Sequence, residues 1–240
     1  MIPLRQGLTV VMPARDEEVH LRDAAGVVLD VVPRYFADFE LIIVNDGSTD
    51  RTGEIAEELA ASHPRVMVVH NLPARGLGGV VRQGIEKARM GLFMYVDSKG
   101  ATPEAALDKI LGCHGHADLI IPYPTNTRER NKIRNLISWA YKQLLNLLFG
   151  LRLRYYNHLV LYRTSQVRGI KAGTDSYAFQ AVYIIKLLKG GASFMEVGVE
   201  DCFNLEGRKS KAFSISNMIG ISLALLRLFR QIHSRNEQDG

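Results

Sequence analysis

The sequence predicts an α/β fold in which a mostly parallel central sheet is flanked by helices, with amphipathic helices in the C-terminal half. Short runs rich in Val and Ile alternate along the first half with stretches whose apolar residues recur at helical spacing. This alternation is typical of βαβ units, which build parallel sheets covered on both faces. The chain has 240 residues, of which 47% are hydrophobic, and that length and composition suit one large domain with a full core.

Each expected element follows from its local pattern. The strands are short apolar runs such as LTVVM, ELIIVN and DLIIP, whose β-branched residues suit a sheet buried on both faces. The helices lie between the strands, and one of them starts at Pro103, a residue suited to a first helical turn. The expected strands are 8–12, 40–45, 65–70, 92–97, 118–122, 155–163 and 193–199; the expected helices are 17–32, 51–62, 79–89, one from 103, 131–149, 177–189 and 213–233.

The helices expected at 131–149 and 213–233 are both amphipathic. In the first, polar residues recur at spacings of three and four, at Asn135, Ser138, Lys142 and Asn146, and a wide apolar arc covers the rest. Such helices suit a protein that lies on an anionic membrane surface. The alternative is that their apolar faces pack on the sheet or join two copies in a homodimer. Residues 236–240 are expected to be disordered.

The positive charge is concentrated in the middle of the chain. The net charge is +5, yet segment 120–171 holds ten Lys and Arg residues and a single acid, Glu129, so it carries +9 and the rest carries −4. This asymmetry favours an anionic partner for the segment, although solvated helix faces would also explain it. Nucleic acid is not expected, because Tyr155 and Tyr156 are the only interleaved aromatic pair and no binding motif appears.

The cysteines and the lack of a signal peptide or membrane span indicate where the protein is located. Cys113 and Cys202 lie far apart without metal-ligand spacing, which fits a reducing compartment and indicates no metal site. The N-terminus lacks the apolar core of a signal peptide, and the longest nearly apolar stretch, 218–226, is far shorter than the ~20 residues of a membrane span. The expected location is therefore cytoplasmic, with the protein peripheral at the inner face of the membrane.

Polar clusters follow three of the expected strands directly. They are the segments PARDE from Pro13, NDGSTD from Asn45 and DSKG from Asp97. Because ligands of open parallel sheets bind outside the carboxyl ends of the strands, these clusters predict one shared site. The turn after the first strand has no glycine, which argues against NAD, and GLGG from Gly76 is interpreted as a loop near a ligand or as a plain turn.

Three motifs, VMPARDEE, ELIIVNDGSTDRT and RGLGGVVRQGIEKARMGLFMYVD, resemble the successive motifs of family 2 glycosyltransferases. Within that family they look most like the dolichol- and polyprenyl-phosphate sugar transferases. The resemblance covers 8–97 closely and continues loosely to about Lys211 through LYRTSQV, YAFQAVYIIKLLKGGASFMEV and the SK of GRKSK. It implies a GT-A domain at 1–211, with a nucleotide-sugar half at 8–100, an acceptor half at 101–211, and a separate helix at 212–235.

The resemblance also implies roles for individual residues. Asp46 would meet the nucleotide base, and Asp97 would orient the ribose and sugar as a catalytic residue. A UDP- or GDP-linked sugar would be the donor. The residues that would bind it are Pro13, Ala14, Arg15, Glu17, Asp46, Gly47, Ser48, Gly76, Gly78, Asp97 and Ser98.

The chain departs from the family pattern at Lys99. Relatives carry Asp-x-Asp after the fourth strand, and the second carboxylate holds Mg²⁺ or Mn²⁺; Lys99 occupies that position here. An ammonium cannot ligate a metal, so Lys99 disfavours a divalent cofactor. The hypothesis is metal-independent transfer with Lys99 as the electrostatic substitute, helped by Arg208, Lys209 and Lys211. The alternative is a non-catalytic nucleotide-sugar-binding protein.

A general base is also missing from its usual places. The family's acidic position in a DFNG-like element falls in YYNH from Tyr155, and the acid usual after FQ is Val182. A phosphate acceptor arrives ionised and needs cations instead of a base. Those cations would be Arg128, Arg130, Lys132 and Arg134, while the base candidates for a hydroxyl acceptor are His158, Asp175, Glu196, Glu200 and Asp201.

The sequence therefore predicts an inverting glycosyltransferase that moves a sugar to a polyprenyl-phosphate-like lipid. A transferase that acts on a small soluble acceptor is the second enzymatic alternative. The sequence leaves open the base and sugar of the donor, the acceptor and the oligomeric state.

Overall fold

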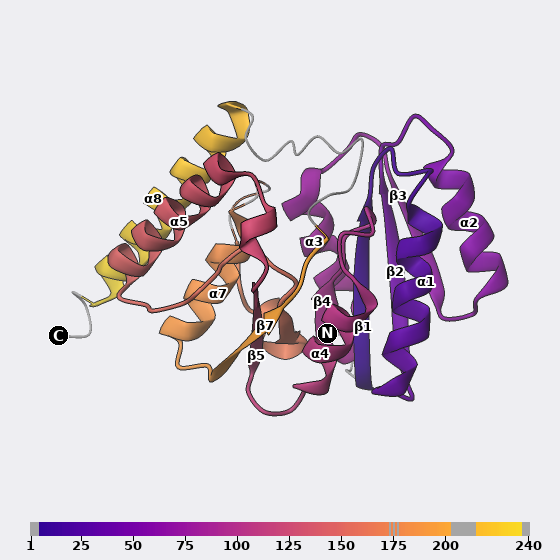
Figure 1. Ribbon diagram of the computed structural model, residues 1–240, viewed down its shortest axis with the longest axis horizontal. Helices are drawn as coiled ribbons and strands as arrows, with labels where there is room; N and C mark the ends of the chain where they lie inside the picture. Colours follow the sequence, from indigo (N-terminus) through magenta and orange to yellow (C-terminus); the bar gives the residue numbers. More distant parts are fainter. Residues whose placement is uncertain (1–4, 173, 175, 177, 203–214, 237–240) are drawn as a thin grey trace.

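A seven-stranded mixed sheet forms the centre of the molecule (Figure 1). The structure is a computed structural model that describes residues 5–172, 174, 176, 178–202 and 215–236. Within these residues the strand order is β3-β2-β1-β4-β6-β5-β7, and only β6 runs antiparallel to its neighbours β4 and β5. The strands are β1 (Arg5–Ala14), β2 (Phe39–Asp46), β3 (Val66–Asn71), β4 (Met90–Tyr95), β5 (Leu119–Pro124), β6 (Leu161–Arg163) and β7 (Phe194–Val199).

The central strands are buried on both faces. In β1, Val10 pairs with Leu41 of β2 on one side and with Met94 of β4 on the other. Val10 and Val11 point to opposite faces, and both have no exposed surface. The continuous apolar sequence of β1 and β2, without alternation, follows from this double coverage.

Two helical layers cover the sheet. One core cluster packs beneath α1 (Leu21–Val31), α2 (Thr52–Ser62) and α4 (Glu104–Gly112). The other packs beneath α3 (Gly76–Lys87), α6 (Thr164–Arg168) and α7 (Phe179–Lys189). Short 3₁₀ turns at Val32–Arg34 and Thr127–Glu129 complete the connections. The arrangement is that of a doubly wound α/β domain, and it confirms the predicted fold class.

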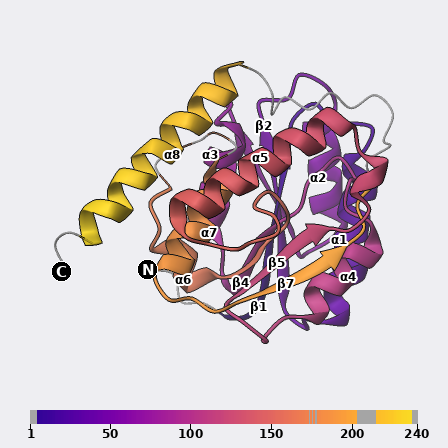
Figure 2. The same cartoon turned by 60° about the vertical axis from the view of Figure 1, so that its left-hand side comes forward.

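Two long helices lie side by side at one end of the domain (Figures 1 and 2). They are α5 (Lys132–Phe149) and α8 (Ile215–Asn236). The rings of Phe149 and Phe229 meet edge to face with centroids 6.3 Å apart, and Leu145 and Leu225 are buried in the same cluster. No helix in the described part of the chain is both long and apolar enough to span a bilayer.

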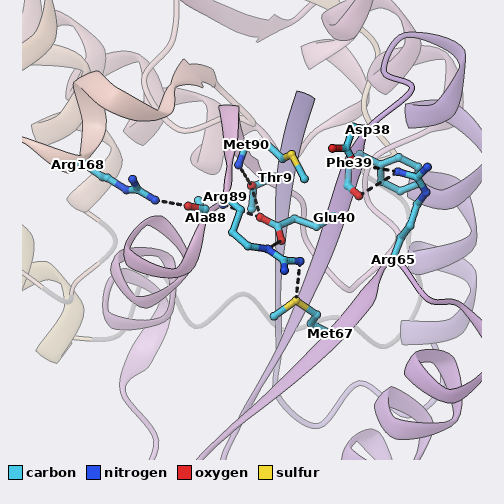
Figure 3. Close-up of polar contacts among 10 residues, drawn as sticks. All are labelled: Thr9, Asp38, Phe39, Glu40, Arg65, Met67, Ala88, Arg89, Met90 and Arg168. Carbon is cyan, nitrogen blue, oxygen red and sulfur yellow. Dashed lines mark hydrogen bonds and ion pairs between the residues drawn. The ribbon is translucent and has the colours of Figure 1, made fainter. Parts of the chain in front are cut away.

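An ion pair between the buried Glu40 and the half-exposed Arg89 lies at the end of the sheet away from the polar loops (Figure 3). The Glu40 carboxylate, in a residue only 1% exposed, accepts hydrogen bonds from Thr9 Oγ1 at 2.7 Å and from Arg89 N and Nε at 2.7 and 2.6 Å. Arg168 donates to the carbonyl oxygen of Ala88 beside this cluster. These contacts join β1, β2 and the α3–β4 connection at this end of the sheet. The polar loops follow the opposite ends of the strands.

Three element predictions need correction. The strand expected at 155–163 is reduced to Leu161–Arg163, because the His158 side chain accepts the Leu159 N–H at 2.8 Å in place of a neighbouring strand. The helix expected at 79–89 begins at Gly76, and α6 was not predicted. At the C-terminus α8 extends to Asn236, whereas 213, 214 and 237–240 lie outside the described residues.

Candidate functional site

The loops after β1 and β2 are joined by reciprocal hydrogen bonds. Asp16 Oδ1 accepts from Thr49 N at 2.9 Å, while Asp16 N donates to Ser48 Oγ at 3.1 Å. Glu17 N donates to Thr52 Oγ1 at 2.7 Å. Asp16 adopts a left-handed conformation with φ 55°, which Asp tolerates better than most residues. The two loops therefore form one rim at the carboxyl edge of the sheet.

Asp46, at the end of β2, fixes the loop that leads into α3. Its Oδ1 accepts from Asn71 Nδ2 at 3.1 Å and from Arg75 N at 2.7 Å, and its Oδ2 accepts from Gly76 N at 2.9 Å. The residue is 5% exposed. A carboxylate has about four acceptor positions, so about one remains for a ligand. The contact of Asp46 with a nucleotide base stays a prediction.

Glycine is required at two positions around Asp46. Gly47 has φ 70° and would place a Cβ 3.3 Å from the Cβ of Ala74, and Gly76 has φ 74°. Gly76 and Gly78 lie in the first turn of α3 rather than in a loop, which corrects the sequence interpretation of GLGG. The Asp46 carboxylate explains this helix start, because it accepts hydrogen bonds from the first backbone N–H groups.

Asp97, directly after β4, organises the third loop. Its Oδ1 accepts from Lys99 N and Ala101 N at 3.0 and 3.1 Å, and its Oδ2 accepts from Thr102 Oγ1 at 2.9 Å. Ser98 Oγ donates to the carbonyl oxygen of Pro13 at 2.7 Å and so joins this loop to the end of β1. The structure thus brings the three predicted polar clusters to one edge.

Lys99 and Glu17 form an ion pair across two of these loops. The Lys99 Nζ lies 3.5 Å from Glu17 Oε1, with the lysine side chain 44% exposed and the glutamate side chain 10% exposed. The family's metal does not fit this arrangement, because an ammonium occupies the place of the second carboxylate and Asp97 is engaged by three donors. Across the described residues, no group of three or more His, Cys, Asp or Glu side chains could hold a metal ion.

A cavity of about 520 Å³ opens beside Asp97 and reaches α5 and α8. The loop after β4 contributes the polar residues Asp97, Ser98 and Lys99. The two long helices contribute the apolar residues Ile137, Leu144, Ile221 and Leu225. Its lining comprises Pro13, Leu77, Tyr95, Asp97, Ser98, Lys99, Arg130, Arg134, Ile137, Ser138, Tyr141, Leu144, Tyr155, Asn157, Phe179, Gln180, Ile221, Ser222 and Leu225.

Two arginines, Arg130 and Arg134, also line the cavity. Arg130 donates to Tyr155 Oη at 3.2 Å. Burial, and then the nearby charge of Arg130, lower the pKa of Arg134 from its ordinary value. Two like charges at one wall are mutually unfavourable, and an anion bound between them would relieve that repulsion.

The predicted site residues separate into three groups. The cavity brings together Pro13, Asp97, Ser98, Lys99, Arg130 and Arg134. Those at the same sheet edge, outside the cavity lining, are Ala14, Arg15, Glu17, Asp46, Gly47, Ser48, Gly76 and Gly78. Arg128 is exposed outside the lining, while Arg208, Lys209 and Lys211 lie outside the described residues.

The candidate bases are engaged elsewhere. His158 is buried, with Nδ1 accepting from Leu159 N and Nε2 lying 2.9 Å from Asp201 Oδ1. Glu196 Oε1 accepts from Arg154 N at 2.6 Å. Neither these nor Glu200 lines the cavity, and Asp175 lies outside the described residues. The described part of the cavity therefore offers an acceptor more cations than bases.

Sequence reasoning missed several cavity residues. On α5, Ser138 lies four residues after Arg134, and Tyr141 lies three residues after Ser138. These spacings place them on one side of the helix, so the helical period could have identified them. Gln180 is buried at the start of α7 and accepts from Tyr95 Oη at 2.9 Å. No local pattern marks Gln180, because its place depends on how α7 packs against β4.

The chain resembles known glycosyltransferases in sequence. The sequence model of the family described as "Glycosyl transferase family 2" matches residues 9–172. The chain is 30% identical over 154 residues to Glycosyltransferase AglD of Haloferax volcanii, covering 61% of this chain but a quarter (25%) of that protein. It is 26% identical over 208 residues to an undecaprenyl-phosphate mannosyltransferase of Micrococcus luteus, covering 79% of this chain and 81% of that one. A dolichyl-phosphate beta-glucosyltransferase of Drosophila melanogaster is 33% identical over 110 residues, covering 43% and 34%.

Solved structures show the same fold. Glucosyl-3-phosphoglycerate synthase from Mycobacterium tuberculosis, in complex with Mn²⁺, UDP and phosphoglyceric acid, superposes with a TM-score of 0.69 at 15% identity, covering 93% of this chain and 78% of that chain. TarS of S. aureus in complex with UDP gives a TM-score of 0.56 at 16% identity, covering 81% and 61%. At these identities the likeness concerns the GT-A fold alone.

Proposed function

The chain belongs to glycosyl transferase family 2, and we propose that it transfers a sugar, with inversion, from a nucleotide-sugar donor to a polyprenyl-phosphate-like lipid. The observation that carries this proposal is a cavity lined by Asp97 and Lys99, by two arginines and by apolar residues of α5 and α8. A donor diphosphate, an acceptor phosphate and an apolar chain each find a matching surface along it.

The donor would lie at the edge formed by the three loops. The base would approach Asp46, which keeps about one acceptor position, and the sugar would approach Asp97. One remaining acceptor suits the single imide N–H of uracil better than the paired N–H donors of guanine. This favours a UDP-linked over a GDP-linked sugar, in keeping with the UDP bound in two of the structures with this fold.

The acceptor phosphate would lie against Arg130 and Arg134, with Ser138 one turn further along α5. Its chain would follow the apolar wall that includes Leu144 and Leu225. The phosphate oxygen would attack the anomeric carbon from the face opposite the nucleoside diphosphate, forming a C–O bond as the bond to the leaving diphosphate breaks. An ionised phosphate has no proton to lose and needs no base; Asp97, the carboxylate in the described lining, is already held by three donors.

The exterior of α5 supports a place at a membrane surface. Its polar residues face the protein: Asn135 Nδ2 donates to Thr127 O, and Asn146 bonds to Leu153 and to the hydroxyl of Tyr156. Six of its apolar residues are exposed, at Ile133, Leu136, Ile137, Trp139, Leu144 and Leu147, whereas Leu145 and Phe149 are buried. The apolar arc of α5 is therefore divided: Leu145 and Phe149 pack in the core, and the exposed part is left for another surface. We propose that an anionic membrane covers it and brings the cavity to the lipid.

A direct test compares three acceptors with a UDP-sugar donor: a long polyprenyl phosphate, the corresponding polyprenol and a five-carbon isoprenyl phosphate. We expect transfer to the first, none to the second and a much higher KM for the third. Equal use of the short phosphate would favour a small soluble acceptor. Donor binding without transfer to any acceptor would favour the non-catalytic alternative.

A further inference from the structure

We infer that the ion pair between Lys99 and Glu17 replaces the divalent cation in donor binding. Lys99 is the group that contacts the donor diphosphate, and Glu17 is the positioning residue that holds it there. The inference rests on the proposed function only in taking a nucleoside diphosphate sugar as the ligand. It adds how the chain binds that ligand at a position where the family has a metal ligand.

The loop after β4 offers a metal few ligands as long as Lys99 is present. Among the described residues, three groups of its own loop donate to Asp97: Lys99 N, Ala101 N and Thr102 Oγ1. They leave about one acceptor position on this carboxylate. Mg²⁺ requires near-ideal octahedral coordination by oxygen. An ammonium two residues away repels a cation and offers it no ligand.

Glu17 has the geometry of a positioning residue. Its backbone N–H is fixed by Thr52 Oγ1 at 2.7 Å, and its side chain is 10% exposed, so the carboxylate has little freedom. Lys99 lies in the cavity lining, whereas Glu17 lies behind it. The pair thus presents its cationic end to the cavity and keeps its anionic end within the loop junction. A lysine without this partner would sample more conformations before it reached a phosphate.

The remaining positive charge is supplied along the same cavity. A divalent cation carries two charges and Lys99 carries one. Arg130 and Arg134 line the cavity that Lys99 enters, so they add to its positive potential while direct contact with the diphosphate is made by Lys99. Preoriented cations of this kind stabilise developing negative charge without a metal.

The test is calorimetric binding of UDP and of uridine to the full chain, each in excess EDTA and in Mn²⁺. The variants are Lys99→Met, Lys99→Asp and Glu17→Gln. The matched control is Lys109→Met, which removes an exposed lysine of α4 outside the cavity. GDP and guanosine are titrated in parallel, so that either base gives a result.

For the unaltered chain, we expect diphosphate affinities in EDTA and Mn²⁺ to agree within twofold. Lys99→Met should weaken the diphosphate at least tenfold, and the nucleoside less than twofold. Lys99→Asp should bind the diphosphate only with Mn²⁺, which it should itself bind as seen by electron paramagnetic resonance. Glu17→Gln should weaken the diphosphate about fivefold under both conditions and leave the nucleoside unchanged, a difference that a purely structural role would not produce.

Tenfold weaker binding of the unaltered chain in EDTA would overturn the inference, as would a Lys99→Met variant with full affinity. If Glu17→Gln weakened the affinities for the diphosphate and the nucleoside equally, Glu17 would be a nucleoside-binding residue and not a positioning residue for Lys99. Metal-free binding that depends on Lys99, without sugar transfer, would refute the proposed function and leave this inference standing. Sugar transfer that requires Mn²⁺ would refute this inference and leave the proposed function standing. The absence of any nucleotide binding would refute both.

Discussion

The outward apolar face of α5 makes a quantitative prediction about membrane binding. Ile133, Leu136 and Leu147 are 70%, 64% and 82% exposed, and they fall on one side of the helix. Replacing all three by Gln keeps good helix formers in place and removes most of the surface that would enter lipid. We expect the triple variant to lose most of its binding to anionic vesicles while it remains folded.

The magnitude follows from the exposed fractions. Full burial of a Leu or Ile side chain is worth roughly 2 kcal/mol, and the three residues together expose about two whole side chains. Complete insertion would therefore contribute about 4 kcal/mol. Residues at the hydrated headgroup boundary gain less, so we take about half, or 2 kcal/mol. That is a loss of about 30-fold in the partition coefficient.

The assay is flotation with vesicles of phosphatidylcholine and phosphatidylglycerol over a range of salt concentrations. Leu72→Gln is the matched control, because Leu72 is 93% exposed yet follows β3 at the far edge of the sheet. The control should float like the unaltered chain. Unchanged flotation of the triple variant would refute the reasoning. A stable dimer that the triple variant converts to monomer would show that a second copy covers the face instead.

Three further predictions concern the acceptor, the core and pH. Arg134→Gln should raise the KM for a polyprenyl phosphate about tenfold without changing the KM for the donor. An acceptor KM equal to that of the unaltered chain would contradict a role of Arg134 in binding the acceptor phosphate. Arg89→Met should lower the free energy of unfolding by about 2–3 kcal/mol in urea titration, because it leaves the buried Glu40 carboxylate without its charge partner, and Glu40→Gln in the same chain should recover part of the loss. Hydrogen bonds from Ser193 lower the pKa of Asp118 in the folded protein. The ionised Asp118 therefore contributes its full share to the free energy of unfolding above the unfolded pKa of about 3.9, and this share is lost as the pH falls through the folded pKa. The Tm difference between the unaltered chain and Asp118→Asn should therefore shrink from pH 6 to pH 3, and a constant difference would exclude this linkage.

The first half of the fold could be predicted because its patterns are local. Each strand that precedes a polar cluster is a continuous apolar run, and Asp46 and Asp97 end up at one sheet edge because parallel strands share their direction. The second half depends on contacts distant in sequence. β6 retains three residues between β4 and β5, and the segment before it is held by His158 and its Asp201 partner. The hydrophobic pattern of segment 155–163 does not predict such side-chain contacts.

The site was predicted in its residue types more than in its pairings. Sequence position placed Lys99 after β4 and Glu17 after β1, but no spacing rule connects the two. The polar spacing on α5 was read correctly as amphipathic, yet Asn135 and Asn146 turn toward the protein while Ile133 and Leu136 are exposed. Periodicity gives the two faces of a helix and does not say which one the fold buries.

The positive charge of segment 120–171 is not one anion-binding surface. Arg163 pairs with Asp118, Arg154 lies over the ring of Tyr123, and Arg168 donates to backbone carbonyl oxygens of α3 and the residue after it. These three cations act within the fold. Only Arg130 and Arg134 of the ten line the cavity, so the expectation of an anionic partner rests on two guanidinium groups joined by Lys99 from another segment. A binding site for phosphate is therefore defined by which cations share a cavity, and the excess charge of a segment is a weak guide to it.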